Sequence, residues 1–124
     1  MIARLYQTVF FRDRLFFFAL AAAFLFHIAL WAIVVRIWMF LKEGGETYIA
    51  LHSRVFYGVD FIGEPYLIFG IPIVGLATIV VNCMLARKAF GVSRFLMGAL
   101  SGMSAITQIF LIMVAFLVFQ LNLY

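Results

Sequence analysis

Residues 15–35 read LFFFALAAAFLFHIALWAIVV, a run of 21 residues without a formal charge. Residues 66–86 form a second such run of 21 residues, and residues 95–119 form a third of 25. A helix rises about 1.5 Å per residue, so each run can cross a bilayer core of roughly 30 Å. Three such runs in 124 residues exceed what a small soluble protein can bury. The sequence therefore predicts an all-α membrane protein with three transmembrane helices, at about 15–41, 65–86 and 95–121.

The overall composition favours a single membrane domain over residues 1–124. Hydrophobic residues make up 68% of the chain and charged residues 11%, which is far from the composition of a soluble domain. The first run is too long for a signal peptide and no small-residue cleavage site follows it, so we expect it to be retained as an anchor. Residues 1–14 have the spacing of a short amphipathic helix on the inner membrane surface, with a frayed terminus as the alternative.

The basic residues are distributed unevenly over the ends of the three runs. Six precede the first run or lie between the second and third: Arg4, Arg12, Arg14, Arg87, Lys88 and Arg94. The loop between the first and second runs holds only Lys42 and Arg54. Because basic loops stay in the cytoplasm, we expect a cytoplasmic N-terminus and 87–94 loop, and an outer 42–64 loop and C-terminus, in the plasma (cytoplasmic) membrane. The formal net charge of +4 then reflects topology and lipid headgroup contact, and no nucleic-acid partner is expected.

The outer loop contains a stretch with strand character. After the turn-forming run KEGGE, residues 48–57 alternate and are rich in strand formers. We expect a short strand or hairpin lying on the membrane, with a turn at Gly58–Asp60. Pro65 suits the first position of the second helix. Pro72 lies inside that span, where it leaves the carbonyl of Ile68 without a donor and predicts a kink.

Each apolar run carries a row of small or polar residues on one helix face. The rows are Ala19, Ala23 and His27; Gly75, Thr78 and Asn82; and Gly98, Ser101, Ala105 and Gln108, with Gly98 and Gly102 as a small-xxx-small pair. Small residues let backbones approach and polar groups in hydrocarbon need partners, so the rows predict a shared helix interface. Depths counted from the inner helix ends at about 1.5 Å per residue predict three hydrogen-bonded pairs. The pairs are His27 with Gln108, Thr78 with Ser104, and Asn82 with Ser101.

These polar residues point to helix packing more than to chemistry. A substrate or proton path centred on His27 is the alternative use of the same interface. His27, His52 and Cys83 lie at three separate levels without ligand spacing, so we expect no metal and no cofactor. No nucleophile with a neighbouring base can be assembled either. The ionisable residues of the outer loop, among them Arg54 and Asp60, are interpreted as solvated or headgroup-contacting, with a catalytic or receptor site as the alternative.

Four motifs between residues 51 and 82 resemble a family pattern. They are Leu51-His52, VFYGVDFIG (55–63), FGIPIVG (69–75) and Val81-Asn82. The pattern is similar to that of an uncharacterised family of small three-span membrane proteins from candidate-phylum bacteria with reduced genomes. The resemblance covers most of residues 49–124, including Gln108 and Asn122, although Ser53-Arg54 departs from the Tyr-Asn of the family pattern. It implies a fold and a bacterial membrane but no activity, and it selects His52, Gly58 and Asp60 if the outer loop holds a site.

The sequence therefore predicts a non-enzymatic accessory or structural subunit that packs with itself or with a larger membrane complex in the lipid bilayer. A small oligomeric transporter or channel that uses His27 and Gln108 is the second hypothesis, and a membrane enzyme with an outer-loop site is the third. The helix-interface candidates are His27, Gly75, Thr78, Asn82, Gly98, Ser101, Gly102 and Gln108. The outer-loop candidates are His52, Arg54, Gly58 and Asp60.

Overall fold

Three long helices and one β-hairpin make up the computed structural model, which describes residues 13–45, 47–54 and 58–123. In chain order the elements are α2 (Arg14–Glu43), β1 (Ile49–Arg54), β2 (Gly58–Gly63), the 3-10 helix η1 (Pro65–Phe69), α3 (Gly70–Ala89) and α4 (Arg94–Leu121). The segments Arg14–Glu43, Pro65–Ala89 and Arg94–Leu121 are each long and apolar enough to span a membrane, as the sequence predicts. The amphipathic helix expected in the first 14 residues falls almost entirely outside the described residues.

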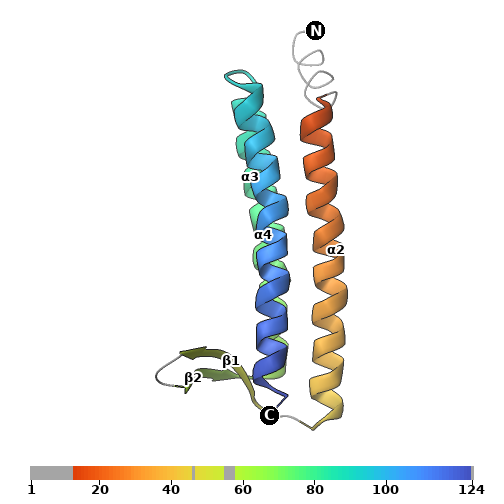
Figure 1. Cartoon of the computed structure of the whole chain (residues 1–124), viewed down its shortest axis with the longest axis vertical. Helices are drawn as coiled ribbons and strands as arrows, with labels where there is room; N and C mark the ends of the chain where they lie inside the picture. The colour runs from red at the N-terminus through yellow and green to blue at the C-terminus, as the bar shows by residue number, and fades with distance from the viewer. Residues whose placement is uncertain (1–12, 46, 55–57, 124) are drawn as a thin grey trace.

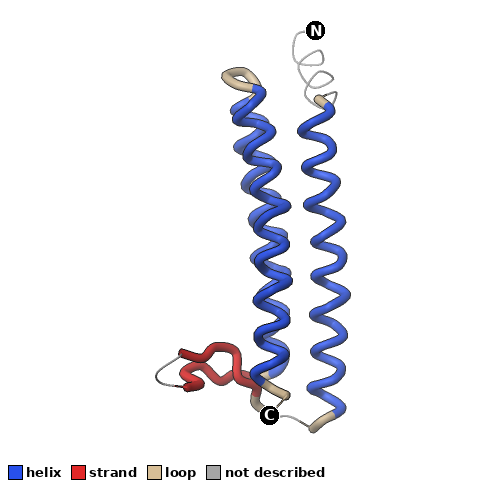
Figure 2. The backbone as a smooth tube through the Cα atoms, in the orientation of Figure 1, coloured by secondary structure: helices blue, strands red, loops and turns tan. Residues whose placement is uncertain are grey.

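The three helices lie side by side and turn back at two common ends (Figure 1). α2 and α4 run in the same direction, and α3 runs against both. The start of α2 and the turn between α3 and α4 lie at one end of the bundle, whereas the hairpin and the end of α4 lie at the other. The hairpin extends sideways from the helix ends instead of continuing along them (Figure 2).

Short local signals set both ends of α2. Asp13 is the N-cap, and its side chain accepts a hydrogen bond from the backbone N–H of Phe16 at 3.0 Å. At the other end Gly45 takes a φ of 74°, in the left-handed region that favours glycine, and the helix stops at Glu43. The 30 residues between these signals rise about 45 Å. α2 is therefore longer than a bilayer core of roughly 30 Å, long enough for both of its ends to reach the headgroup layers.

Buried positions recur along the helices at alternating intervals of three and four residues. In α2 they are Ala23, His27, Leu30, Val34, Ile37 and Leu41. His27 and Gln108 are 81 positions apart in the chain. For every buried residue of α2, the residue 81 positions later, in or just after α4, is also buried or half-buried. An average spacing of about 3.5 residues is typical of left-handed helix pairs with interdigitated side chains. α2 and α4 therefore pack in one constant register.

α4 is the central helix of the bundle. α2 and α3 both pack mainly against α4, and they contact each other much less. One core cluster combines α2 and α4 with buried Ile49 and Ile68 near the hairpin, and a second joins Phe16, Ala86 and Met97 at the opposite end. Only 22% of each span is buried within the chain, so most of the helical surface is left to face lipid or a partner.

The second span changes its helix type close to Pro72. Residues 65–69 form η1, with Pro65 at its start as predicted, and the α-helix begins at Gly70. Pro72 is thus in the first turn of α3, where a backbone N–H has no intrahelical acceptor and proline removes no hydrogen bond. The carbonyl of Ile68, expected to lack a donor, faces the backbone N–H of Gly70. A junction between two helix types therefore replaces the proline kink that the sequence predicts inside a continuous α-helix.

The hairpin of the outer loop is confirmed, but its turn is not where the sequence places it. β1 and β2 pair antiparallel from Ile49 opposite Gly63 to Arg54 opposite Gly58, with irregular register on both sides of His52. Gly58, Val59 and Asp60 therefore belong to β2, and the prediction that they form the turn is wrong. The connection falls at residues 55–57, which lie outside the described residues.

Candidate functional site

A chain of polar side chains crosses the middle of the bundle and joins all three helices. His27 Nδ1 lies 3.0 Å from Gln108 Oε1, so the predicted pair between α2 and α4 is present. Gln108 Nε2–H also donates to the backbone carbonyl of Gly75 in α3 at 2.9 Å. On the other side, Trp31 Nε1–H donates to His27 Nε2 at 3.0 Å. Gln108 is fully buried and His27 is only 6% exposed, so these bonds lie within the protein interior.

One arrangement of protons satisfies every atom of this polar chain. An indole N–H can only donate, so His27 Nε2 accepts and the proton of a neutral ring is on Nδ1. Nδ1–H then donates to Gln108 Oε1, and the amide N–H₂ of Gln108 points to Gly75, as its distance to that carbonyl indicates. Trp31, four residues after His27, was not selected from the sequence. Its position one helical turn from His27, on the same helix face, could have identified it as a hydrogen-bond partner.

Gly75 allows Gln108 to reach the backbone of α3. A Cβ atom built on Gly75 would lie 2.6 Å from Gln108 Oε1 and 3.0 Å from Leu111 Cδ1. Any side chain at this position would displace the buried amide. The small residue is therefore part of the polar chain and not only a general packing position.

A second hydrogen bond between α3 and α4 lies closer to the end that carries the α3–α4 turn. Asn82 Nδ2–H donates to Ser104 Oγ at 3.0 Å, and the Ser104 hydroxyl donates to the carbonyl of Leu100 at 3.3 Å. The predicted pairs of Asn82 with Ser101 and of Thr78 with Ser104 are therefore wrong. Counting depth along separate helices does not resolve partners that lie one turn apart.

Ser101 and Thr78 find their hydrogen-bond partners within their own helices. The buried Ser101 hydroxyl donates to the carbonyl of Met97 at 3.0 Å, and Thr78 Oγ1 donates to Val74 at 2.9 Å. Hydroxyl groups in a helix commonly bond to the carbonyl one turn earlier, and this removes their need for a partner on another helix.

The two glycines of the predicted small-xxx-small pair have different surroundings. A Cβ on Gly98 would lie 2.6 Å from Leu15 Cδ2, so Gly98 permits close contact with the start of α2. A Cβ on Gly102 would meet nothing within 4 Å among the described residues. Only Gly98 of this pair therefore serves the packing of the described bundle.

An aromatic cluster lies beside the polar chain, toward the hairpin end. Phe69 of η1 stacks on Trp31, with ring centroids 6.0 Å apart, and lies 5.7 Å from the ring of Trp38. These ring contacts pack η1 against α2, whereas α2 and α3 otherwise make few contacts with each other. The cluster also holds Trp31 in place over His27, whose ring it meets edge-on.

Asn122 attaches the hairpin to the end of α4. Its side-chain oxygen accepts from the backbone N–H of Ala50 at 2.7 Å, and its Nδ2–H₂ donates to the carbonyls of Ala50 at 2.8 Å and Val118 at 2.7 Å. The amide thus satisfies both backbone groups of Ala50 on the edge of β1, as a neighbouring strand would. The sequence draws attention to Asn122 only through the family resemblance, because its partner is distant in the chain.

The four outer-loop candidates all lie in the hairpin. His52 is exposed in β1 and pairs with Phe61, while Arg54 pairs with Gly58 across the two strands. Asp60 lies in β2. The side chains of Arg54 and Asp60 lie outside the described ones.

The buried polar groups of the described residues are hydrogen-bonded within the chain. Every buried side-chain nitrogen or oxygen of the described residues has a hydrogen-bond partner, and no three potential ligands among those residues are grouped for a metal ion.

Comparison of the chain with protein-family models, with curated proteins and with solved structures gives no match.

Proposed function

We propose that this chain is a non-enzymatic accessory or structural subunit of a bacterial plasma membrane, which packs with a larger membrane complex or with copies of itself. The resemblance to the uncharacterised family of small three-span proteins from reduced-genome bacteria belongs to the same proposal. The observation that carries it is the hairpin, which Asn122 fixes at the end of the bundle and which leaves apolar side chains exposed.

The exposed side chains of the hairpin support a role in binding. Phe61 and Ile62 of β2 are 54% and 62% exposed, in a strand that lies beside the helix ends (Figure 2). The hairpin also extends to one side of the bundle, where a neighbouring protein could be reached (Figure 2). Large exposed apolar side chains on such a projecting element are consistent with an interaction surface.

The interior of the bundle supports packing over transport. A transport path needs polar groups that can exchange partners with a substrate. Here His27 and Gln108 bond to each other, to Trp31 and to Gly75. The oligomeric transporter or channel therefore ranks second. For the outer-loop enzyme, the hairpin supplies exposed His52 but no described side-chain constellation that favours catalysis.

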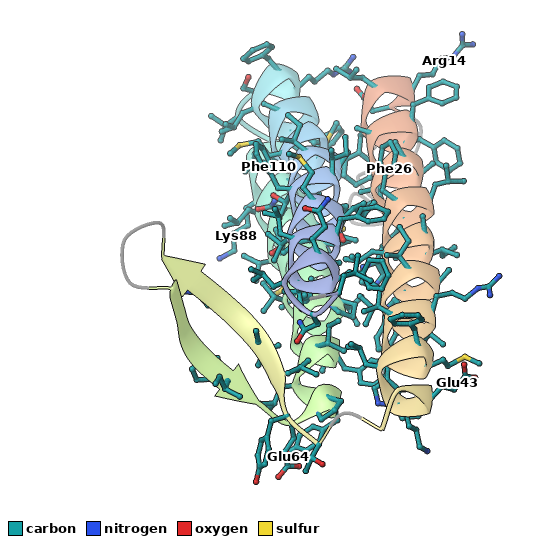
Figure 3. The ribbon with its side chains drawn as sticks, turned by 60° about the horizontal axis from the view of Figure 1, so that its bottom comes forward. Arg14, Phe26, Glu43, Glu64, Lys88 and Phe110 are labelled. Atoms are coloured by element: carbon teal, nitrogen blue, oxygen red, sulfur yellow. The ribbon has the colours of Figure 1, made fainter. Side chains whose placement is uncertain are left out.

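The proposed orientation has the start of α2 in the cytoplasm and the hairpin outside. Arg14 lies at one end of α2, while Glu43 and Glu64 lie at the end of the bundle that carries the hairpin (Figures 1 and 3). Arg87, Lys88 and Arg94 flank the turn between α3 and α4, which is at the same end as Arg14. The positive-inside tendency supports a cytoplasmic location for this end.

Native mass spectrometry of the tagged chain, extracted gently from its own membrane, tests the proposed function. We expect the chain to be detected either with a larger membrane protein in fixed stoichiometry or as a defined homo-oligomer. Such a homo-oligomer, reconstituted in liposomes, should show no selective flux. The Asn122→Ala variant should lose the complex because the hairpin is no longer fixed to α4. Gln120→Ala, at an exposed position of the same helix end, is the matched control.

A monomer without any partner would contradict the proposal. A homo-oligomer that conducts a selective flux abolished by His27→Ala, in a variant that still folds, would support the transporter instead.

A further inference from the structure

A groove on the outer face of the bundle combines an apolar lining with a single charge. It lies between α2 and α4 toward the hairpin end and has a volume of about 450 Å³, within the range of roughly 300–1,000 Å³ common for small-molecule sites. Its lining residues are Ala32, Ile33, Arg36, Ile37, Phe40, Phe116 and Phe119. The rings of Phe40 and Phe119 meet edge to face at 5.4 Å and form one wall.

Arg36 is the only charged residue of this lining, and it lies within the span. Among the described residues it has neither an ion-pair partner nor a hydrogen-bond partner for its guanidinium group. Lys42, nearer the helix end, already lies over the ring of Trp38 at 5.0 Å. A cation in this part of a membrane needs an anionic partner or contact with the headgroups.

The depth of Arg36 matches the level of lipid phosphates once its side chain is extended. Its Cα lies about 11 Å from the midpoint of α2 along the helix, at about 1.5 Å per residue. The edge of a bilayer core centred on that midpoint is about 15 Å away. The long side chain of arginine can cover this difference and place the guanidinium at the headgroup boundary, level with Phe40 and Phe119. The part of the groove lined by Ala32, Ile33 and Phe116 lies on the membrane-centre side of that level.

We propose that this groove binds one phospholipid of the leaflet on the hairpin side. The guanidinium of Arg36 holds the lipid phosphate through paired N–H donors, and the start of an acyl chain lies along Ile33 and Phe116, toward the membrane centre. Arginine is well suited to this contact because its planar fork matches phosphate oxygens. The charge complementarity selects a phosphate-bearing lipid over one without phosphate, and the apolar lining selects a lipid over free phosphate.

Native mass spectrometry of the delipidated full chain in a non-ionic detergent, with phosphatidylglycerol or diacylglycerol added, tests the site. We expect one phosphatidylglycerol to be retained and diacylglycerol to be lost. Arg36→Gln should weaken phosphatidylglycerol retention roughly tenfold, since a charge-assisted contact is removed. Arg94→Gln, an exposed arginine at the other end of the bundle, should leave retention unchanged.

Phe116→Ala provides a second test if the arginine variant does not fold. It should also weaken retention, whereas Phe110→Ala, on the exposed surface of the same helix but outside the groove (Figure 3), should not. Equal retention of phosphatidylglycerol by the folded Arg36→Gln chain would overturn the proposal. Equal retention of diacylglycerol, or dimerisation through the groove in place of lipid binding, would overturn it as well.

Discussion

At the scale of single residues, Gln108 determines how the three helices are connected. Its amide accepts from His27 and donates to Gly75, so one buried side chain bonds to two other helices. Without water inside a bilayer, the alternative for these groups is to find another partner or remain unsatisfied. Measured interhelical hydrogen bonds in membranes nevertheless average only about 0.6 kcal/mol, so Gln108 is expected to adjust stability and geometry and not to decide folding.

Replacing Gln108 by leucine tests this estimate. The Gln108→Leu variant should fold and lose roughly 1 kcal/mol of unfolding free energy, since two interhelical hydrogen bonds are removed. Reversible unfolding in mixed micelles, followed by circular dichroism, measures the change. Thr107→Val is the control, because Thr107 bonds only to the carbonyl of Met103 in its own helix at 2.9 Å. A loss as large for the control as for Gln108→Leu would contradict the role of the polar chain.

Gly75 and Gly102 are both helical glycines, but only Gly75 is buried, so the same substitution should affect them differently. Gly75→Ala should destabilise the bundle by about 1–3 kcal/mol, the usual range for overpacking, because the new Cβ meets the amide of Gln108. Gly102→Ala meets no described atom within 4 Å and should be neutral or stabilising by up to about 1 kcal/mol through helix propensity. The same unfolding assay measures both. Equal destabilisation by the two substitutions would refute the close approach at Gly75.

At the level of helices and strands, the buried residues of α2 and their counterparts on α4 are separated by a constant 81 positions in the chain, and this separation describes how the two helices pack. Buried polar residues at the core positions of helix pairs are known to fix register. His27 and Gln108 occupy such positions, and the apolar pairs on either side follow the same separation. The polar contact therefore specifies which turns of α2 and α4 meet, while the apolar residues provide most of the contact area.

Disulfide cross-linking tests this register. In a Cys83→Ala background, Val34→Cys combined with Ala115→Cys should form a cross-link on oxidation, because both positions are buried in one cluster and 81 apart. Val34→Cys combined with Val114→Cys should not, since Val114 is 42% exposed and one position out of register. Loss of thiol labelling after oxidation measures the cross-link. Preferential cross-linking of the second pair would show that the helices pack differently.

The sequence predicts the elements better than the contacts between them. Apolar length and charge-free runs are local properties, so the three helices could be predicted directly, as could a hairpin between the first two. The His27–Gln108 pair was also predictable, because few polar residues lie that deep. The partner of Asn82 was not, since Ser101 and Ser104 are one turn apart and only packing selects between them. The Asn122–Ala50 contact could not be predicted, because it joins a side chain to backbone groups of β1, and the position of that strand beside α4 is known only from the folded structure.

At the scale of the whole molecule, the bundle separates two ends of different chemistry. One end carries the basic residues around the turn between α3 and α4, and the other carries the hairpin, the end of α4 and Glu64 (Figures 1 and 3). Most of each span is exposed to lipid or to a partner, which agrees with the proposed role of a membrane subunit that presents the hairpin on one side.

In the proposed topology the bundle crosses the membrane and holds the hairpin and the α3–α4 turn on opposite sides. Val92 in the turn is 84% exposed and Tyr48 before β1 is 63% exposed, so either position can carry a label. In a Cys83→Ala background, a membrane-impermeant maleimide should label the Tyr48→Cys variant in intact cells and the Val92→Cys variant only after lysis. Labelling of both variants from the same side of the membrane would contradict the three-span bundle on which the account rests.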